Sequence, residues 1–397
     1  MTIGIISNLY PPLVEGGAEM VAQTMVEGLR KHGQRVFVIT TRPYQSLKSL
    51  TLQREMVGEV PVYCFYPLNF YHYAQGFRFH PLVRFFWHVF DIFNVHSVIV
   101  IKKILRQEKP DILITHNMMG IGFLIPRLIR RLGMRHVHIL HDVQLYNPSG
   151  LIVKGETSFV QLLANALGYS TLMRFLFSKT DLIISPSQFL LDFYRDRGFF
   201  KNLRTAVLPN PVQLRPASSD QRQGPTLRLM YVGHLSKAKG IAGLVEVMLR
   251  LHTMPLTLKV IGKGPLLTTL KMKTASDSRI SFYGWLSPEN VRALFPDSDI
   301  VVVPTLCYDN SPTVVFEALS SGVPVIVSDI GGAKEIVRDG YNGWVFEADN
   351  WSALGQLLTR LACSRQEVSL RAAQARASIA HLSIDQYTRT LLNRIGT

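Results

Sequence analysis

Short apolar runs alternate with amphipathic segments along most of the chain. Near the N-terminus, an apolar run at Ile3–Ser7 is followed by a loop and by a segment, Ala18–His32, whose apolar residues recur at helical spacing. Gly33 ends that segment, and a second apolar run follows at Arg35–Thr40. This order predicts a strand, a helix and a second strand, which is the unit from which parallel sheets are built.

The same unit recurs in the second half of the chain, as a strand at Leu227–Gly233, a helix at Ile241–Leu251 and a strand at Leu256–Ile261. Two such units predict two doubly wound α/β domains in tandem. Other short runs rich in β-branched residues predict buried parallel strands at Asp111–Thr115, Arg135–Leu140, Leu182–Ser185, Ala206–Leu208, Ile300–Val303 and Val323–Ser328. From Trp351 onward the pattern predicts helices and no strand.

Domain boundaries follow from this pattern and from a polar, proline-containing stretch in mid-chain. We predict an N-terminal domain over residues 1–212, a linker over 213–226 and a C-terminal domain over 227–380. Residues 381–397 are predicted to form a helix that packs back on the N-terminal domain.

Composition and charge narrow the class of protein. The chain has 397 residues, of which 47% are apolar, and this excludes a disordered or collagen-like protein. Three scattered cysteines exclude a disulfide framework or a cysteine zinc site and indicate a reducing compartment. No signal peptide and no uninterrupted membrane span is apparent, so we predict a cytoplasmic protein. The formal net charge is +15, but no recognisable nucleic-acid module accompanies it, so no nucleic-acid partner is predicted.

One stretch of the N-terminal half has an unusual composition. Between Glu59 and Asp91 there is no acidic residue, whereas twelve aromatic side chains occur there together with Arg78 and Arg84. These residues form either a thick hydrophobic core or a surface that lies on anionic lipid, where aromatic and cationic side chains are favoured together. The second interpretation predicts peripheral attachment to the inner face of the membrane.

Candidate chemistry lies after the predicted strands, because ligands of open parallel sheets bind at the carboxyl ends of strands. Gly16 and Gly17 precede a helix, where glycine lets backbone N–H groups approach an anion, although a plain turn has the same composition. Lys239, beside Gly240 at another helix start, can place a cation against a diphosphate, or it is simply a solvated lysine.

The segment after the strand Ile300–Val303 carries the most information. Its sequence favours a helix in which Ser311 is the N-cap and Pro312 the first residue, so the N–H groups of Thr313 and Val314 would face a docked phosphate. The segment carries two carboxylates and an amide close to this helix start: Asp309, Asn310 and Glu317.

Four motifs together resemble the retaining glycosyltransferases of family 4. They are the Gly-Gly loop, Gly-His-Leu-x-x-x-Lys-Gly, an acid followed by x7-Glu-Ala-x-x-x-Gly-x-Pro-Val-Ile, and Ser-Asp-x-Gly-Gly-x-x-Glu. The resemblance runs from Ile5 to about Ala348 and is most specific over Leu229–Phe346. It implies the GT-B fold, in which two Rossmann-like domains face each other across the active-site cleft. It also implies a nucleotide-diphosphate sugar as donor, with no cofactor.

The resemblance assigns roles to individual residues. Lys239 matches the lysine that neutralises the donor diphosphate, and Glu317 matches the acid that holds the ribose. Asp309 occupies the place of the glutamate that grips the sugar hydroxyls, and His141 matches the histidine beside the sugar. Gly16 and Gly17 match the loop near the phosphates and the acceptor.

Two positions depart from the family pattern. His234 replaces the usual arginine, so one positive charge on the phosphates is missing or is supplied by Lys237 or another residue. Asp309 is one methylene shorter than the usual glutamate, which leaves the identity of the donor sugar open. The acceptor is predicted to be a glycan or a lipid-linked hydroxyl.

A metal site, an oxidoreductase and a non-catalytic scaffold are the alternatives to this prediction. Asp297-Ser298-Asp299 matches an Asp-x-Asp metal signature, but it precedes a strand and is interpreted as a turn, so no metal site is predicted. An oxidoreductase lacks support because Gly-x-Gly-x-x-Gly is absent. A catalytically weak GT-B scaffold at the membrane is the remaining alternative.

Overall fold

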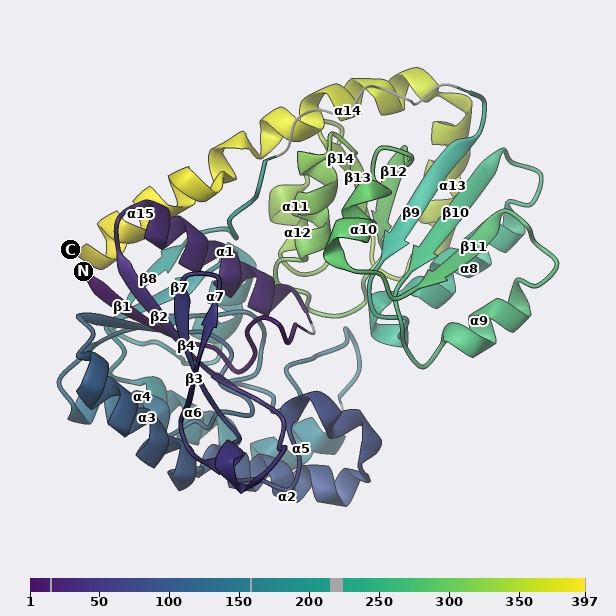
Figure 1. Cartoon of the computed structure of the whole chain (residues 1–397). Coiled ribbons are helices and arrows are strands. Elements are labelled where there is room, and N and C mark those ends of the chain that lie inside the picture. The colour runs from purple at the N-terminus through teal and green to yellow at the C-terminus, as the bar shows by residue number, and fades with distance from the viewer. Residues whose placement is uncertain (15, 158, 215–223, 397) are drawn as a thin grey trace. The chain divides into compact units, whose positions relative to one another are not determined.

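The chain folds into two compact α/β units. The structure, a computed structural model, describes residues 1–14, 16–157, 159–214 and 224–396. The first unit contains Met1–Leu151, Thr157–Pro211 and Ile384–Thr397, and the second contains Ile152–Glu156 and Val212–Ser383. Each unit is a twisted sheet with helices on both faces (Figure 1), as predicted for two doubly wound domains.

An eight-stranded sheet forms the centre of the first unit, in the order β3-β4-β2-β1-β5-β6-β7-β8. All neighbouring strands are parallel except β3, which pairs antiparallel with β4. The strands are β1 (Thr2–Ile6), β2 (Arg35–Thr41), β3 (Gln53–Val57), β4 (Val60–Phe65), β5 (Ile112–Thr115), β6 (Arg135–Ile139), β7 (Leu182–Ser185) and β8 (Arg204–Val207). The helices are α1 (Gly17–Lys31), α2 (Pro81–Ile92), α3 (Val95–Glu108), α4 (Ile125–Arg131), α5 (Phe159–Ala166), α6 (Tyr169–Phe177), α7 (Gln188–Asp196) and α15 (Ile384–Gly396), with 3-10 turns η1 (Leu47–Leu50) and η2 (Tyr73–Arg78).

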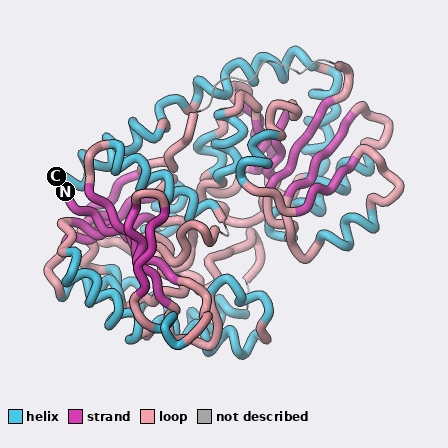
Figure 2. Tube along the Cα trace, viewed as in Figure 1, coloured by secondary structure: helices cyan, strands magenta, loops and turns pink. Residues whose placement is uncertain are grey.

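The second unit has a six-stranded parallel sheet in the order β11-β10-β9-β12-β13-β14. Figure 2 shows the strands of each unit in magenta, with cyan helices around them. Its strands are β9 (Leu227–Val232), β10 (Leu256–Ile261), β11 (Ile280–Gly284), β12 (Ile300–Val303), β13 (Val325–Ser328) and β14 (Gly343–Phe346). Its helices are α8 (Ile241–Arg250), α9 (Leu267–Lys273), α10 (Pro288–Ala293), α11 (Thr313–Ser320), α12 (Ala333–Ile336), α13 (Trp351–Cys363) and α14 (Arg365–Ser378), with 3-10 turns η3 (Lys237–Lys239) and η4 (Ala380–Leu382).

Strand order places one switch point in each sheet. β1 lies between β2 and β5, and β9 lies between β10 and β12, so consecutive crossovers leave these central strands in opposite directions. Ligands of doubly wound sheets bind at such points, beyond the carboxyl ends of the strands. The loops that follow β1, β5, β9 and β12 are therefore the candidate ligand-binding loops.

The predicted strands agree with the structure within one to two residues at their ends, because most of them are short apolar runs with mainly buried positions. β5, β7, β12 and β13 are buried at every position. Four strands were not predicted: β3, β4, β11 and β14. β3 and β11 have many exposed positions, so neither carries a strong apolar run. β14 is apolar and mainly buried, but it is only four residues long.

Two short parts of the chain lie in a different unit from their sequence neighbours. Ile152–Glu156 belongs to the second unit, although it falls inside the predicted N-terminal domain. The last helix, α15, belongs to the first unit, where the Asp385 carboxylate lies 3.0 Å from His32 Nε2 on the loop after α1. Most of the predicted linker, residues 215–223, lies outside the described residues.

Candidate active site

The loop between β9 and α8 brings Lys239 to the switch point of the second unit. Lys239 ends the short turn η3, and Gly240 follows with φ of 69°. A Cβ atom on Gly240 would lie 1.7 Å from the carbonyl oxygen of Pro304, just after β12. Only glycine therefore lets this loop pack against the end of β12.

Lys239 forms an ion pair with Asp309, from the loop that follows β12. Lys239 Nζ donates a hydrogen bond to Asp309 Oδ2, and the two side chains are 31% and 19% exposed. Burial alone would lower the pKa of Lys239, but the charge of Asp309 and its hydrogen bond outweigh burial and raise it. Lys239 is thus charged at neutral pH, at the place where a diphosphate was predicted.

Two other segments hold the Asp309 loop in place. The N–H of Gly332, after β13, donates to the carbonyl oxygen of Asp309 at 2.9 Å, and Gly331 lies so close that a Cβ there would be 2.1 Å from that oxygen. On another side, the N–H of Tyr308 donates to the carbonyl of Ile152 at 2.9 Å. The Gly331-Gly332 motif was visible in the sequence, but nothing there indicated that Ile152–Glu156 would pair with this loop.

The helix that begins after Asp309 differs in one detail from the prediction. α11 begins at Thr313, and Pro312 is its N-cap with extended backbone (φ −64°, ψ 118°), so Ser311 lies one position before the cap. The cause is that Pro312 adopts the extended conformation instead of the helical one. The N–H groups of Thr313 and Val314 are still in the first turn, where no intrahelical acceptor reaches them. Glu317 is half-buried one turn further, and Asn310 is 3% exposed.

His234 does not supply the charge of the arginine that it replaces. Its side chain is exposed, yet partial desolvation of the ring together with the charges of Lys239 and Lys263 lowers its pKa below the ordinary value. Lys237 is exposed and lies 2.6 Å from the Glu156 carboxylate. In this structure its charge is therefore already paired within the second unit.

In the first unit, the two predicted glycines lie at the start of α1. The backbone N–H of Gly16 donates to the Glu19 carboxylate at 2.8 Å, and Glu19 is 4% exposed. A buried acid thus caps this helix start, a feature that sequence reasoning missed. A Glu three residues after the N-cap position is the signal by which it was detectable.

His141 lies after β6 and meets His116, which follows the neighbouring strand β5. His116 Nδ1 and His141 Nε2 are 2.8 Å apart, and the two rings meet edge to edge with their centroids separated by 5.1 Å. Burial lowers the pKa of His141 to about 4. His136 and His138 are buried within β6, and a ring nitrogen of each lies 2.8 Å from Thr115 Oγ1.

The Asp-x-Asp sequence takes part in ion pairs. Asp299 is fully buried, and its carboxylate meets Arg228 at 3.1 Å and Arg365 at 2.9 Å. Asp297 lies 3.8 Å from Lys259. Both acids thus have cationic partners at the amino end of β12. Within the described residues, no cluster of three or more His, Cys, Asp or Glu side chains has the arrangement of a metal site.

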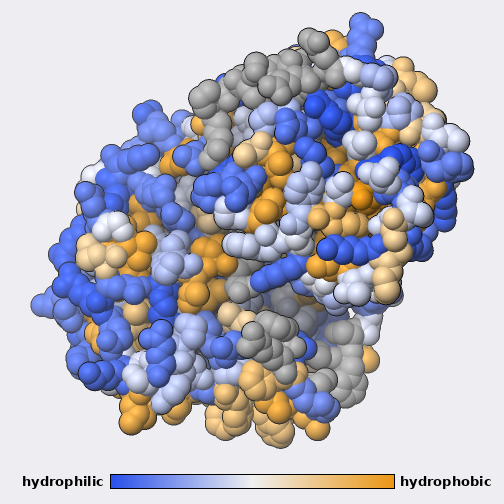
Figure 3. Space-filling view, turned by 45° about the vertical axis from the view of Figure 1, so that its right-hand side comes forward, coloured by the Kyte–Doolittle hydropathy of each residue, from blue (hydrophilic) through white to orange (hydrophobic). Residues whose placement is uncertain are grey.

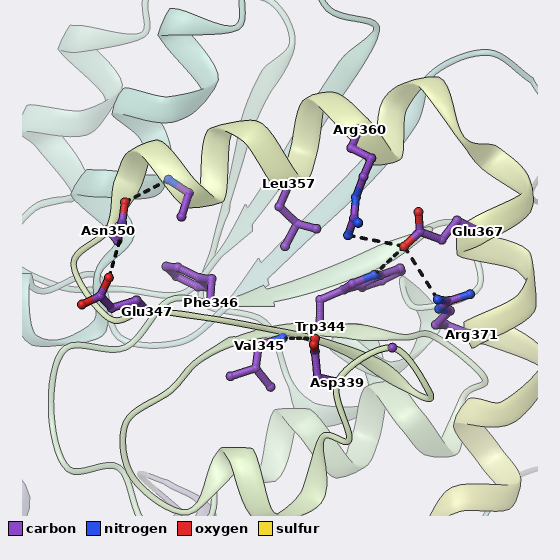
Figure 4. Close-up of a pocket in the computed structure, with 12 residues that line it drawn as sticks. Asp339, Trp344, Val345, Phe346, Glu347, Asn350, Leu357, Arg360, Glu367 and Arg371 are labelled. Atoms are coloured by element: carbon purple, nitrogen blue, oxygen red, sulfur yellow. Dashed lines mark hydrogen bonds and ion pairs between the residues drawn. The ribbon is translucent and has the colours of Figure 1, made fainter.

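A cavity of about 450 Å³ opens beside the edge strand β14, and none of the predicted site residues lines it (Figure 4). Its charged groups largely pair with one another. Glu367 accepts a hydrogen bond from Trp344 Nε1 at 2.9 Å and lies 3.5 Å from Arg360 and 3.8 Å from Arg371. The Asp339 carboxylate accepts the N–H of Val345, so it covers part of the strand edge. We assign this cavity to the packing of α13 and α14 on the sheet.

Comparison with known proteins identifies the family. Residues 15–215, half of the chain, match the model of Glycosyltransferase Family 4, and residues 226–364 match the model of Glycosyl transferases group 1. The chain belongs to glycosyltransferase family 4. As a member of this family it is a glycosyltransferase whose donor is a nucleotide-diphosphate sugar.

Individual relatives of this glycosyltransferase cover between 68% and 91% of it. An uncharacterized 42.6 kDa protein in the cps region of Klebsiella pneumoniae is 26% identical over 85% of this chain and 88% of its own. A putative teichuronic acid biosynthesis glycosyltransferase, TuaC of Bacillus subtilis, is 24% identical over 91% and 89%. A UDP-Gal:alpha-D-GlcNAc-diphosphoundecaprenol alpha-1,3-galactosyltransferase of Escherichia coli is 24% identical over 68% and 70%.

Solved structures agree with the fold of this glycosyltransferase. Sucrose-phosphate synthase from Thermosynechococcus elongatus superposes with a TM-score of 0.76 at 17% identity, covering 100% of this chain and 99% of that one. Anabaena HepE, solved in complex with UDP and glucose, superposes with a TM-score of 0.72 at 17% identity and the same coverage. At this identity the likeness shows the fold, which is GT-B.

Proposed function

We propose that the protein is a retaining, metal-independent glycosyltransferase that moves a sugar from a nucleotide-diphosphate donor to a hydroxyl of a glycan or a lipid-linked acceptor at an anionic membrane surface. The observation that carries the donor half of this proposal is the Lys239–Asp309 ion pair beside the first turn of α11. It puts a cation, a carboxylate and helix-end N–H groups at one switch point.

The roles follow from the chemistry of each group. Lys239 and the N–H groups of Thr313 and Val314 would bind the diphosphate and stabilise the charge that grows on it as the sugar leaves. Glu317, on α11, would hold the ribose, and Asp309 would bind the sugar hydroxyls. The family resemblance, together with the placement of Asp309 on the Lys239 ammonium, supports these roles.

Retention is proposed because no acid is assigned to the opposite face of the sugar. A two-carboxylate scheme needs one carboxyl group as nucleophile and a second as acid or base. Asp309 is instead paired with Lys239, and Glu317 lies on α11. We therefore favour attack by the acceptor on the face that the diphosphate leaves. The departing phosphate oxygen would take the acceptor proton, as the resemblance implies.

Membrane attachment is proposed from the outward face of α2. Leu82, Phe86, Phe90 and Phe93 recur every three or four residues and are each more than half exposed. Trp87, about 100° round the helix from Phe86, faces inward and is 3% exposed. A helix whose solvent side is apolar reverses the usual pattern and marks an interaction surface. In Figure 3, orange side chains gather along the lower edge of the molecule.

Charge favours an anionic lipid as the occupant of this surface. Between Glu59 and Glu108 the chain has a single acid, Asp91, and it is 1% exposed. Exposed cations on α2 and on the next helix, α3, include Arg84 and Lys103. Surfaces that combine aromatic, apolar and cationic side chains without acids bind anionic bilayers.

The apolar helices would lie on the bilayer without crossing it. The stretch Leu82–Glu108 is long and apolar enough to span a membrane by length and composition, and 39% of its most apolar window is buried. It consists of two helices of twelve and fourteen residues, separated where the Asn94 side chain accepts the N–H of Ser97. Each is shorter than the ~20 residues that a span needs. A surface helix suits a lipid-linked acceptor, such as the one named for the E. coli relative.

The activity is tested by incubating the purified protein with UDP-, GDP- and ADP-sugars and a polyprenyl-diphosphate-linked sugar. We expect transfer with retained anomeric configuration, which NMR of the product reads directly. Activity should survive EDTA, because a lysine and helix N–H groups neutralise the diphosphate without a metal. Loss of activity in EDTA with recovery in Mg²⁺ would overturn metal independence. Failure of every nucleotide to shift the melting temperature would favour the weak-scaffold alternative.

Membrane attachment is tested by co-sedimentation with phosphatidylglycerol and phosphatidylcholine vesicles. The variant Phe86→Glu/Phe90→Glu should lose most binding to the anionic vesicles. The matched control Met272→Glu/Trp285→Glu changes two exposed apolar residues of the second unit, which are 68% and 62% exposed, by the same charge. Binding should weaken with salt, because charges are screened over ~8 Å at physiological ionic strength. Equal loss in both variants would show a general charge effect and contradict the proposed surface.

A further inference from the structure

His116, which follows β5, and His141, which follows β6, contact each other through their ring nitrogens in the first unit. β5 and β6 are parallel neighbours, so the residues just beyond their ends lie side by side. His116 is fully buried, and its ring lies nearly parallel to that of His141, at an interplanar angle of 22°. The single short contact between their nitrogens joins His116 Nδ1 to His141 Nε2 at 2.8 Å.

Both rings are neutral at physiological pH, which fixes how this contact can form. Burial lowers the pKa of His116 well below its ordinary value, with a further contribution from its histidine neighbours, and burial lowers that of His141 to about 4. A neutral imidazole has one N–H donor and one acceptor nitrogen. One of the two rings must therefore donate, and the other must accept.

The other nitrogen of His116 decides which ring donates. His116 Nε2 is buried and has no hydrogen-bond partner among the described residues. Buried N–H groups without a partner are rarer than acceptors without one. The proton of His116 therefore belongs on Nδ1, from which it donates to His141 Nε2. His141 must then carry its own proton on Nδ1.

We propose that His116 is a positioning residue that fixes the tautomer and the ring plane of His141. This inference rests on the proposed function and on the family resemblance, which places His141 beside the donor sugar. With its Nε2 occupied, His141 carries its only N–H on Nδ1, and Nε2 is not available to take the acceptor's proton. His141 would then serve as a fixed hydrogen-bond donor, which agrees with a reaction in which the leaving phosphate takes that proton.

Two substitutions at His116 separate positioning from packing. In His116→Asn the amide nitrogen can lie near the place of Nδ1, so the donor is kept although the ring is lost. In His116→Phe an aromatic ring is kept at this place, but the donor is lost. A packing role predicts that Phe is the better replacement, whereas a positioning role predicts that Asn is.

The expected kinetic result is a fall in kcat of about ten- to a hundredfold for His116→Phe, with the donor KM unchanged, because a misplaced group costs turnover. His116→Asn should retain kcat within a few-fold. Melting temperatures identify any variant that fails to fold, and His116→Leu serves as a second variant without the donor. Full kcat in His116→Phe, or no rescue in folded His116→Asn, would overturn the proposal.

A spectroscopic test does not depend on activity. Long-range ¹H–¹⁵N correlation spectra of ¹⁵N-histidine-labelled protein report which ring nitrogen carries the proton. The signals of His141 are those missing in His141→Asn. We expect the Nδ1-protonated form in the wild type and in His116→Asn, and its loss in His116→Phe. An Nε2-protonated His141 in the wild type would overturn the proposal even if the protein is an active transferase. If no transfer is found, the spectra still test the pair.

Discussion

Asp309 is expected to have opposite effects on nucleotide binding and on turnover. In the free protein its carboxylate holds the Lys239 ammonium, which a bound diphosphate would have to take over. Asp309→Asn keeps the shape of the side chain and removes this competitor together with its negative charge. We therefore predict that the variant binds a nucleoside diphosphate more tightly than the wild type does, whereas kcat with the nucleotide sugar falls.

The magnitude follows from the burial of the pair. The side chains are 31% and 19% exposed, so the pair is partly screened by solvent and is worth about 0.5–1 kcal/mol. Releasing Lys239 should thus tighten binding of the nucleoside diphosphate about two- to fivefold, since 1.4 kcal/mol corresponds to about tenfold. Loss of the pair should lower the melting temperature by only about 2–4 °C. The fall in kcat should be larger, about ten- to a hundredfold, if Asp309 holds the sugar as the anomeric bond breaks.

Isothermal titration calorimetry with UDP, GDP and ADP measures the first effect, and steady-state kinetics with the matching nucleotide sugar measures the second. Asp309→Glu is the matched control, because it restores the family residue and keeps the charge next to Lys239. Its affinity for the nucleoside diphosphate should not exceed that of the wild type. A tenfold or greater loss of nucleoside diphosphate affinity in folded Asp309→Asn would refute the reasoning, because Asp309 would then be supporting the diphosphate site.

Three further predictions concern other parts of the chain. Glu317→Ala should raise the donor KM by about 10- to 150-fold with little change in kcat, because a charge-assisted hydrogen bond worth about 1.5–3 kcal/mol is lost. An unchanged donor KM would contradict a ribose role. Gly331→Ala should lower kcat about tenfold, because the new Cβ would displace the Asp309 backbone. Gly340→Ala is the matched control: Gly340 has a similar φ of 71°, but a Cβ there would meet only Arg371 at 3.9 Å, so kcat should be unchanged. Burial raises the pKa of Asp91 to about 8, so between about pH 4 and 8 the folded state holds a proton that the unfolded state has lost, and stability falls as pH rises. Asp91→Asn should remove this fall in thermal melts at pH 5, 7 and 9, and a parallel pH dependence in both proteins would show that Asp91 does not titrate in this way.

Local sequence carried much of the donor half of the candidate site. Lys239, Asp309 and the start of α11 each follow a strand that is apolar on both faces, so the strands and the loops behind them were predictable from one short window each. The predicted N-cap was wrong by one residue, because Ser311 and Pro312 fit either position in a one-dimensional pattern. The contact of Lys239 with Asp309 crosses seventy positions of sequence, and no local window contains it.

The contacts that place the site residues came only with the tertiary structure. Ile152 contacts the Asp309 loop because the segment Ile152–Glu156 belongs to the second unit, whereas the residues before and after it belong to the first. His116 meets His141 only because β5 and β6 are adjacent and parallel. Hydrophobic periodicity cannot report such pairings, since it records which residues are buried and not which residues they are buried against. The same limit explains why the aromatic stretch had two interpretations: only the fold shows that Trp87 faces inward and Phe86 and Phe90 face solvent.

The sequence alone determined the two α/β domains, the family and the chemical types of the site residues, because short buried strands and glycine-bounded loops are local properties. Which side chains meet, and which face of a helix is covered, was decided by the packing of segments that lie far apart in the chain.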